Sequence, residues 1–137
     1  MYGSATLDGG TGNDTLTLDS GTVATGGADN DHFIAPYFYA YEGWQEASVT
    51  DFKSGEDKID VSSLLSSYTL AAYQGGNPFE QQFLRLTQDS NDTLLQIDID
   101  GTASEQGFVT VIRLTGVTAI DLTADDFLPI GAGPSFA

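Results

Sequence analysis

Residues 9–17 read Gly9-Gly10-Thr11-Gly12-Asn13-Asp14-Thr15-Leu16-Thr17, a nonapeptide of the form Gly-Gly-x-Gly-x-Asp-x-apolar-x. A second copy with one change occupies residues 26–34, as Gly26-Gly27-Ala28-Asp29-Asn30-Asp31-His32-Phe33-Ile34. A partial copy lies at residues 3–8, where Ala5 stands in the position of the aspartate. Repetition of this kind predicts short equivalent units that stack on one another, as in a parallel β-helix.

Each nonapeptide combines a tight turn with a short strand. Its glycines permit positive φ angles and let backbone carbonyl groups approach an ion closely. Its aspartate supplies a hard, charged oxygen, which Ca²⁺ prefers together with several carbonyl oxygens. The apolar residue of the last three positions points into a narrow core. The repeat therefore predicts Ca²⁺ as the cofactor and a short β-roll over residues 3–34, in which each coil uses two nonapeptides.

The two complete copies have nearly the spacing of one coil. Leu16 and Phe33 hold the same position of the motif and lie 17 residues apart, one fewer than two nonapeptides. The half-coil at residues 18–25 has therefore lost one residue and most of its motif. We expect one Ca²⁺ site between the turns at 9–14 and 26–31. The predicted metal ligands are Gly9, Gly10, Gly12, Asp14, Gly26, Gly27, Asp29 and Asp31, of which Asp14 is the clearest.

Asp29 replaces glycine at the fourth position of the second copy. Aspartate is among the few residues with a side chain that tolerate the left-handed backbone region, so this turn can still form. An ordinary Gly/Asp-rich loop would also explain one such motif. Two copies and a phased partial copy favour the repeat.

The composition suits one folded domain over residues 1–137, because 40% of the residues are hydrophobic. The chain has 20 acidic and 4 basic residues and a net charge of −16, so nucleic acid and anionic membranes are unsuitable partners. It has no cysteine, which excludes disulfides and thiol chemistry. The sequence contains no apolar run of about 18 residues, so it predicts no membrane span. It also shows no basic segment followed by an apolar one, so it predicts no Sec-type signal. Met1 falls inside a repeat, so we expect a piece of a longer protein.

Beyond the roll, the sequence predicts an aromatic capping segment and then a β-rich region. Residues 35–48 contain Trp44 and a run of aromatic residues at 37–41; we expect them to cover the open end of the roll, although exposed rings there could instead stack on sugars. The predicted elements that follow are a strand–turn–strand unit at 49–61, a short helix at 62–65, strands at 83–87, 93–100 and 108–114, and a capped single turn at 123–128. Residues 129–137 are predicted to be a flexible tail.

These motifs together resemble the C-terminal RTX (repeats-in-toxin) region of proteins exported by type I secretion. The nonapeptides carry the first part of the resemblance. The other matching segments are Val49-Thr50-Asp51-Phe52 with residues 55–62, Gln96-Ile97-Asp98-Ile99-Asp100-Gly101, Leu114-Thr115-Gly116-Val117, Asp121-Leu122-Thr123 and Asp126-Phe127-Leu128. The resemblance covers most of the chain and is weakest at residues 66–82.

The resemblance implies how such a chain is made and used. Members of this family leave the cell C-terminus first through the type I secretion machinery, without cleavage of an N-terminal signal. They stay unfolded in the low Ca²⁺ of the cell and fold outside when Ca²⁺ binds the repeats. It therefore implies a secreted, extracellular or cell-surface location.

The carboxylates of Asp98 and Asp100 share one predicted strand face. They could form an acid/base pair or bind a further Ca²⁺ ion, but a solvated strand face explains them as well. His32 is the only histidine and lies inside a repeat, so the sequence offers no Ser/His/Asp or Cys/His set. We therefore predict no catalytic residues and no enzyme activity.

The predicted fold is all-β: a short Ca²⁺-binding parallel β-roll that continues into an antiparallel β cap at 49–128 with one to three short helices. The predicted function is that of a non-catalytic module that carries the secretion signal and drives Ca²⁺-dependent folding of a large exported protein, such as an adhesin. The alternative is an accessory module that binds a carbohydrate or cell-surface ligand, as part of an adhesin or an extracellular polysaccharide-modifying enzyme.

Overall fold

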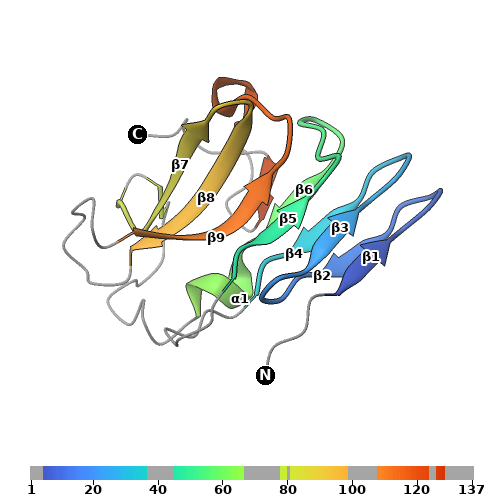
Figure 1. The fold of residues 1–137 in the computed structure, drawn as a ribbon, viewed down its shortest axis with the longest axis horizontal. Coiled ribbons are helices and arrows are strands. Elements are labelled where there is room, and N and C mark those ends of the chain that lie inside the picture. The colour runs from blue at the N-terminus through green and yellow to red at the C-terminus, as the bar shows by residue number, and fades with distance from the viewer. Residues whose placement is uncertain are drawn as a thin grey trace.

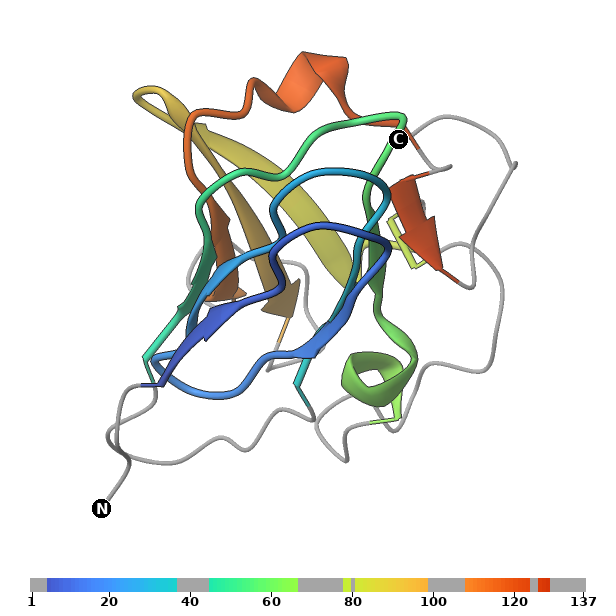
Figure 2. The ribbon, with the colours of Figure 1, turned by 90° about the vertical axis from the view of Figure 1, so that its right-hand side faces the viewer.

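A computed structural model describes residues 5–36, 45–66, 78–79, 81–98, 108–123 and 126–128 of the chain. Its N-terminal part is a parallel roll of short strands (Figure 1). On one side β1 (Thr6–Asp8), β3 (Val23–Thr25) and β5 (Ala47–Val49) pair in parallel. On the other side β2 (Thr15–Thr17), β4 (His32–Ile34) and β6 (Lys58–Asp60) do the same. Figure 2 shows the successive coils overlapping when the molecule is viewed along the stack.

The register of the roll follows from its apolar residues. Leu16, Phe33 and Ile59 occupy matched positions on one side, and each is buried. Ala24 and Val49 are matched and fully buried on the other. Since alternate residues of a strand face opposite sides, the three-residue strands fill this narrow core with one inward residue each, or with two in β5, where Ala47 and Val49 are both buried. The predicted all-β roll is confirmed.

The roll continues beyond residue 34, where the sequence pattern placed its end. The unit at 49–61 is strand, turn and strand as predicted, but its strands add in parallel to β3 and β4 as a third coil. The turn between them keeps Gly55 at the fourth position of the motif but lacks the first two glycines, which hid the repeat. Its inward residues nevertheless match those of the coil before it. Burial of these apolar residues therefore forms a third coil without the complete motif.

The C-terminal strands extend both sheets of the roll. Strands β7 (Leu84–Asp89), β8 (Asp92–Asp98) and β9 (Phe108–Leu114) form the predicted antiparallel cap, and β9 also pairs in parallel with β5. The result is one six-stranded sheet in the order β1-β3-β5-β9-β8-β7. The short helix α1 (Ser62–Leu65) is present as predicted, and a single 3-10 turn covers Ala119–Asp121.

Residues 123–128 were predicted to end the fold with a single capped turn. The capped turn is present, because the Asp126 N–H donates to the Thr123 carbonyl at 3.0 Å and Asp126 Oδ2 accepts from the Thr123 N–H at 2.9 Å. The chain then adds a two-residue strand that was not predicted, β10 (Phe127–Leu128), which pairs in parallel with β6. Phe127 is fully buried in register with Ile59, and its ring centroid lies 5.0 Å from that of Phe79. A hydrogen bond of 2.7 Å from the Val61 N–H to the Leu128 carbonyl closes the pairing. Burial of one aromatic ring therefore returns the end of the described chain to the roll.

An arginine joins the roll to the cap. The Arg113 guanidinium contacts Glu46, just before β5, and the carboxylates of Asp89 and Asp92 in the β7–β8 turn. The Gly116 N–H and the Arg113 guanidinium hold the pKa of Asp92 below its usual value.

Within the described ranges, no helix is long and apolar enough to cross a membrane.

We expect Phe127→Ala to destabilise the protein by about 3–5 kcal/mol, the usual cost of truncating a buried phenylalanine. The loss should appear as a lower urea midpoint for unfolding in saturating Ca²⁺. Ile120→Ala is the matched control, because that side chain is 88% exposed and its truncation should leave the midpoint nearly unchanged. Equal midpoints for Phe127→Ala and Ile120→Ala would contradict the closure of the roll by β10.

Candidate metal site

The turns at 9–14 and 26–31 lie one above the other, because the strands that follow them, β2 and β4, are paired in register. Three side chain-to-backbone hydrogen bonds of 2.9 Å join the turns: Gly12 N–H to Asp29 Oδ2, Asn30 N–H to Asn13 Oδ1, and Asp14 N–H to Asp31 Oδ1. Each bond links residues 17 positions apart. The predicted ligand-bearing turns are therefore neighbours in space.

The first glycine of each turn lies against the aspartate of the same turn. A Cβ atom on Gly9 would stand 2.6 Å from Asp14 Oδ2 and 2.7 Å from the Gly26 carbonyl oxygen. A Cβ atom on Gly26 would overlap Asp31 Oδ2. Contacts this short exclude any side chain at either position. The glycines thus allow carboxylate and carbonyl oxygens to gather in the space inside the turns.

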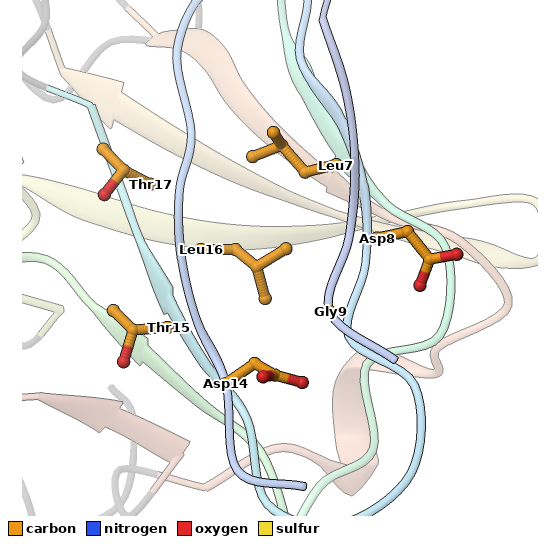
Figure 3. Close-up of a pocket in the computed structure, with 7 residues that line it drawn as sticks. All are labelled: Leu7, Asp8, Gly9, Asp14, Thr15, Leu16 and Thr17. Carbon is orange, nitrogen blue, oxygen red and sulfur yellow. The ribbon is translucent and has the colours of Figure 1, made fainter. Parts of the chain in front are cut away.

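Two of these oxygens have no hydrogen-bond partner. Asp14 Oδ2 and Asp31 Oδ2 are both buried, and neither accepts a hydrogen bond from a described residue. Asp31 as a whole is completely enclosed. In Figure 3 the Asp14 carboxylate points toward Gly9, whereas Thr15 points away from it. Burial of a charged oxygen without a partner is costly, so the place of a cation is indicated here. The available donors are all oxygens, which fits Ca²⁺.

The remaining predicted ligands contribute backbone rather than side chains. Gly10, Gly12 and Gly27 have φ angles of 81°, 92° and 91°, which shape the two turns. Asp29 adopts a left-handed φ of 73°, and its exposed carboxylate is engaged with Gly12. Among the described residues, no three His, Cys, Asp or Glu side chains are grouped to hold a metal. An ion between these turns must therefore use backbone carbonyls beside Asp14 and Asp31.

A third turn, at 50–57, adds Asp57 to the aspartates of the first two turns. Asp14, Asp31 and Asp57 thus form a column of aspartates along the stack. The Asp31 N–H donates to Asp57 Oδ1 at 2.9 Å, as the Asp14 N–H donates to Asp31. Asp51 accepts from the Gly26 and Gly27 N–H groups at 2.9 and 2.8 Å. From their sequence positions, Asp51 and Asp57 are expected to be turn and strand-edge residues first and metal ligands second, so neither was among the predicted ligands. The spacing Asp57-x-Ile59, which repeats that of Asp14 and Leu16, was the available signal.

This arrangement shifts the pKa of the Asp57 carboxyl. Burial raises the pKa of its carboxyl, and the charges of Asp31 and Asp51 add to the shift. Hydrogen bonds from the backbone of Asp31 and Lys53 oppose the shift without cancelling it. The column is thus a place where negative charge accumulates with little solvent.

The column is tied at its far end to the C-terminal segment. Asp126 accepts hydrogen bonds from Gly55 N–H at 3.0 Å, Ser54 Oγ at 2.7 Å and Thr123 N–H at 2.9 Å. The third turn and the approach to β10 are therefore held by one buried carboxylate.

At the opposite end of the column, beside β1 and β2, a cavity of about 450 Å³ opens (Figure 3). Its lining residues are Leu7, Asp8, Gly9, Asp14, Thr15, Leu16 and Thr17.

The other candidate groups are not part of this site. His32 is exposed on the outer face of β4, in register between Thr15 and Lys58. Asp98 is buried at the end of β8, so the solvated strand face proposed for it is wrong. Asp100, the aromatic segment at 37–44 and the tail at 129–137 lie outside the described residues.

Comparison with known proteins identifies relatives of this fold. The family model described as "Peptidase M10 serralysin C terminal" matches residues 5–128. The AlgE6R3 subunit from the Azotobacter vinelandii mannuronan C5-epimerase is similar in structure, with a TM-score of 0.59 and 24% identity over 95% of this chain and 73% of that one. The AlgE6R2 subunit of the same enzyme gives a TM-score of 0.47 and 22% identity over 96% and 93% of the two chains. No curated protein sequence matches. The predicted RTX-type resemblance is confirmed.

Asp57→Asn should make the metal-free chain less sensitive to pH. Because the folded pKa of Asp57 is raised above the ordinary 3.8, the folded state binds this proton more tightly than the unfolded state. The free energy of unfolding in chelator should therefore fall as the pH rises from 3.8 through the raised pKa. Asparagine has no proton to bind in this range, so the variant should lose this part of the slope. Its side-chain NH2 cannot accept the second of the two backbone N–H groups that Asp57 holds, so its stability at acid pH should be lower than that of the wild type.

Far-UV circular dichroism and urea unfolding in chelator at a series of pH values would measure the effect. Asp60→Asn is the control, since Asp60 lies in the same strand region and its Oδ1 accepts from the Ser62 N–H, a bond that asparagine can keep while the charge is removed. An Asp57→Asn chain with the pH slope of the wild type would refute the assignment.

Proposed function

This chain belongs to the family of peptidase M10 serralysin C-terminal domains, and we propose from this membership that it is a non-catalytic Ca²⁺-binding module whose folding depends on the ion. The observation that supports the proposal most directly is the pair of buried carboxylate oxygens, on Asp14 and Asp31, that have no hydrogen-bond partner among the described residues. The family match lies in a C-terminal region rather than a catalytic domain, which agrees with the absence of a catalytic set in the sequence.

The ion would lie between the turns at 9–14 and 26–31. Asp14 and Asp31 would hold it with their carboxylates, and the backbone of Gly9, Gly10, Gly12, Gly26, Gly27 and Asp29 would shape the site or supply carbonyl oxygens. When bound, Ca²⁺ would supply two positive charges where the chain has only negative ones. Its tolerance for irregular, oxygen-only coordination suits a site made from two turns.

Folding and binding are coupled by the cost of burying these carboxylates. A chain with a net charge of −16 repels itself, and closing the stack removes Asp31 and Asp57 from water. Burial of unpaired charge is strongly unfavourable. A cation that binds the folded state and not the unfolded state would offset this cost and shift the equilibrium toward the fold.

This coupling suits a protein that crosses an envelope unfolded. In the low Ca²⁺ of a cell the proposed stack would be unstable, and in a Ca²⁺-rich exterior it would close. We therefore extend the proposal to export by the type I secretion machinery and to an extracellular or cell-surface location. The module would then fold at the end of a larger exported protein, whose activity lies elsewhere.

A second candidate function is carbohydrate binding. Its specific support is a polar and aromatic strip on the cap, where the Arg85 guanidinium lies 4.0 Å from the centroid of the Phe108 ring. Gln96 joins the strip through hydrogen bonds with Arg85, Thr87 and Thr110. Aromatic and guanidinium groups of this kind are typical of sugar-acid recognition, and the structural relatives are subunits of a mannuronan-modifying enzyme.

Calcium titration of the metal-free chain should produce β structure, and Mg²⁺ at equal concentration should not. Asp14→Asn and Asp31→Asn should each weaken Ca²⁺ binding by more than about tenfold, since the loss of even a supporting partner costs a metal site that much. Isothermal titration calorimetry gives the affinity and far-UV circular dichroism gives the structure.

Asp19→Asn is the matched control for these variants. Asp19 lies in the turn on the opposite side of the roll, where its carboxylate accepts from the Ser20 N–H, so the substitution removes a charge without touching the proposed site. Full β structure in excess chelator, unchanged by Ca²⁺, would rule out the coupling of folding to the ion.

If the second candidate is right, the chain should be retained by immobilised mannuronan in affinity electrophoresis. Arg85→Ala and Phe108→Ala should each reduce the retention. Lys53→Ala should not, because Lys53 pairs with Glu56 on the third turn, away from the strip. Equal mobility of all four chains with and without the polysaccharide would eliminate this function.

A further inference from the structure

Asp29 differs from the repeat in its side chain and in what that side chain contacts. It holds the fourth position of the second nonapeptide, where the first nonapeptide has Gly12. Its φ of 73° lies in the left-handed region, as does the φ of 92° at Gly12. The backbone shape is therefore common to both turns. A glycine at 29 would adopt it with less strain, so the backbone alone gives no reason for a carboxylate here.

The Asp29 carboxylate reaches the matching position of the neighbouring turn. Its Oδ2 accepts a hydrogen bond of 2.9 Å from the Gly12 N–H. Of the three bonds between the turns, this is the one made by a residue that stands in place of a motif glycine. The Gly12 N–H belongs to the same turn as Asp14, and Asp29 lies two residues before Asp31. The bond therefore links the two segments that carry the unpartnered oxygens.

We propose that Asp29 is a positioning residue that fastens the turn at 9–14 over the turn at 26–31 and so sets the affinity of the cation site between them. The inference rests on the proposed Ca²⁺ function. A bond that needs no ion raises the fraction of molecules in which both turns are correctly placed. Apparent affinity increases in proportion to that fraction. The Asp29 charge adds attraction for a cation at the exposed edge of the site.

Three variants separate the hydrogen bond from the charge. Asp29→Gly removes both and restores the motif residue, so it is not expected to impair folding through the backbone. Asp29→Asn removes the charge and keeps an oxygen that can accept from Gly12. Asp8→Asn is the control, since the Asp8 carboxylate lies beside the same turn but accepts from Gly10 N–H, two residues on, without bridging to the second turn.

Calorimetric titration with Ca²⁺ should show Asp29→Gly weakened by about threefold to tenfold, the range of one net hydrogen bond. Asp29→Asn and Asp8→Asn should show smaller and similar losses, which high salt should reduce. Amide hydrogen exchange should show the Gly12 N–H exposed in Asp29→Gly and protected in Asp29→Asn. This second readout, recorded in saturating Ca²⁺ where all of the chains are folded, reports the fastening directly.

The outcomes distinguish the inference from the function on which it rests. A wild-type chain that binds no Ca²⁺ refutes the proposed function. A wild type that binds, together with an Asp29→Gly chain that binds as tightly or more tightly, overturns the fastening role alone. Equal losses for Asp29→Gly and Asp29→Asn would also overturn it, because the effect would then be one of charge.

Discussion

The enclosure of aspartate carboxylates within the stacked turns is the constraint on which the rest of this structure depends. Asp14, Asp31 and Asp57 each follow a turn and precede an inward apolar residue, so the packing that buries Leu16, Phe33 and Ile59 also buries the carboxylates. The apolar core and the negative column cannot form separately. Hydrophobic burial favours the stack and charge burial opposes it. In the proposed function, a bound cation offsets the cost of burying the charge.

The two ends of the column differ in how this charge is treated. Asp57 and Asp126 have backbone N–H groups on both of their carboxylate oxygens. Asp14 and Asp31 each have an oxygen with no such donor. The carboxylates nearest the C-terminal cap are therefore satisfied by the protein, whereas those that precede β2 and β4 are only partly satisfied. If the proposed ion binds between these two turns, the cap closed by β10 would provide an end against which the first coils stack.

Local pattern was enough to predict the first two coils of the roll and the stacking of the turns at 9–14 and 26–31. Gly9, Asp14 and Leu16 recur in kind as Gly26, Asp31 and Phe33, and the repeat fixes both turn shape and inward position. The third coil escaped prediction because its turn has lost the first two glycines of the motif, although Gly55-x-Asp57-x-Ile59 retains the rest. β10 escaped because two residues carry no periodicity, and its partner β6 is distant in sequence. The partner of Asp29 escaped because residue type indicates backbone tolerance and says nothing of a contact 17 residues away.

Anomalous diffraction from crystals grown with Ca²⁺ would test the central claim most directly. The account predicts a calcium peak between the turns at 9–14 and 26–31, about 2.3–2.6 Å from Asp14 and Asp31 carboxylate oxygens, which is the usual Ca²⁺–oxygen distance. The same crystals should show the two turns in the register found here. A well-ordered stack with no anomalous peak between these turns, or with Asp14 Oδ2 and Asp31 Oδ2 bonded to protein donors instead, would contradict it.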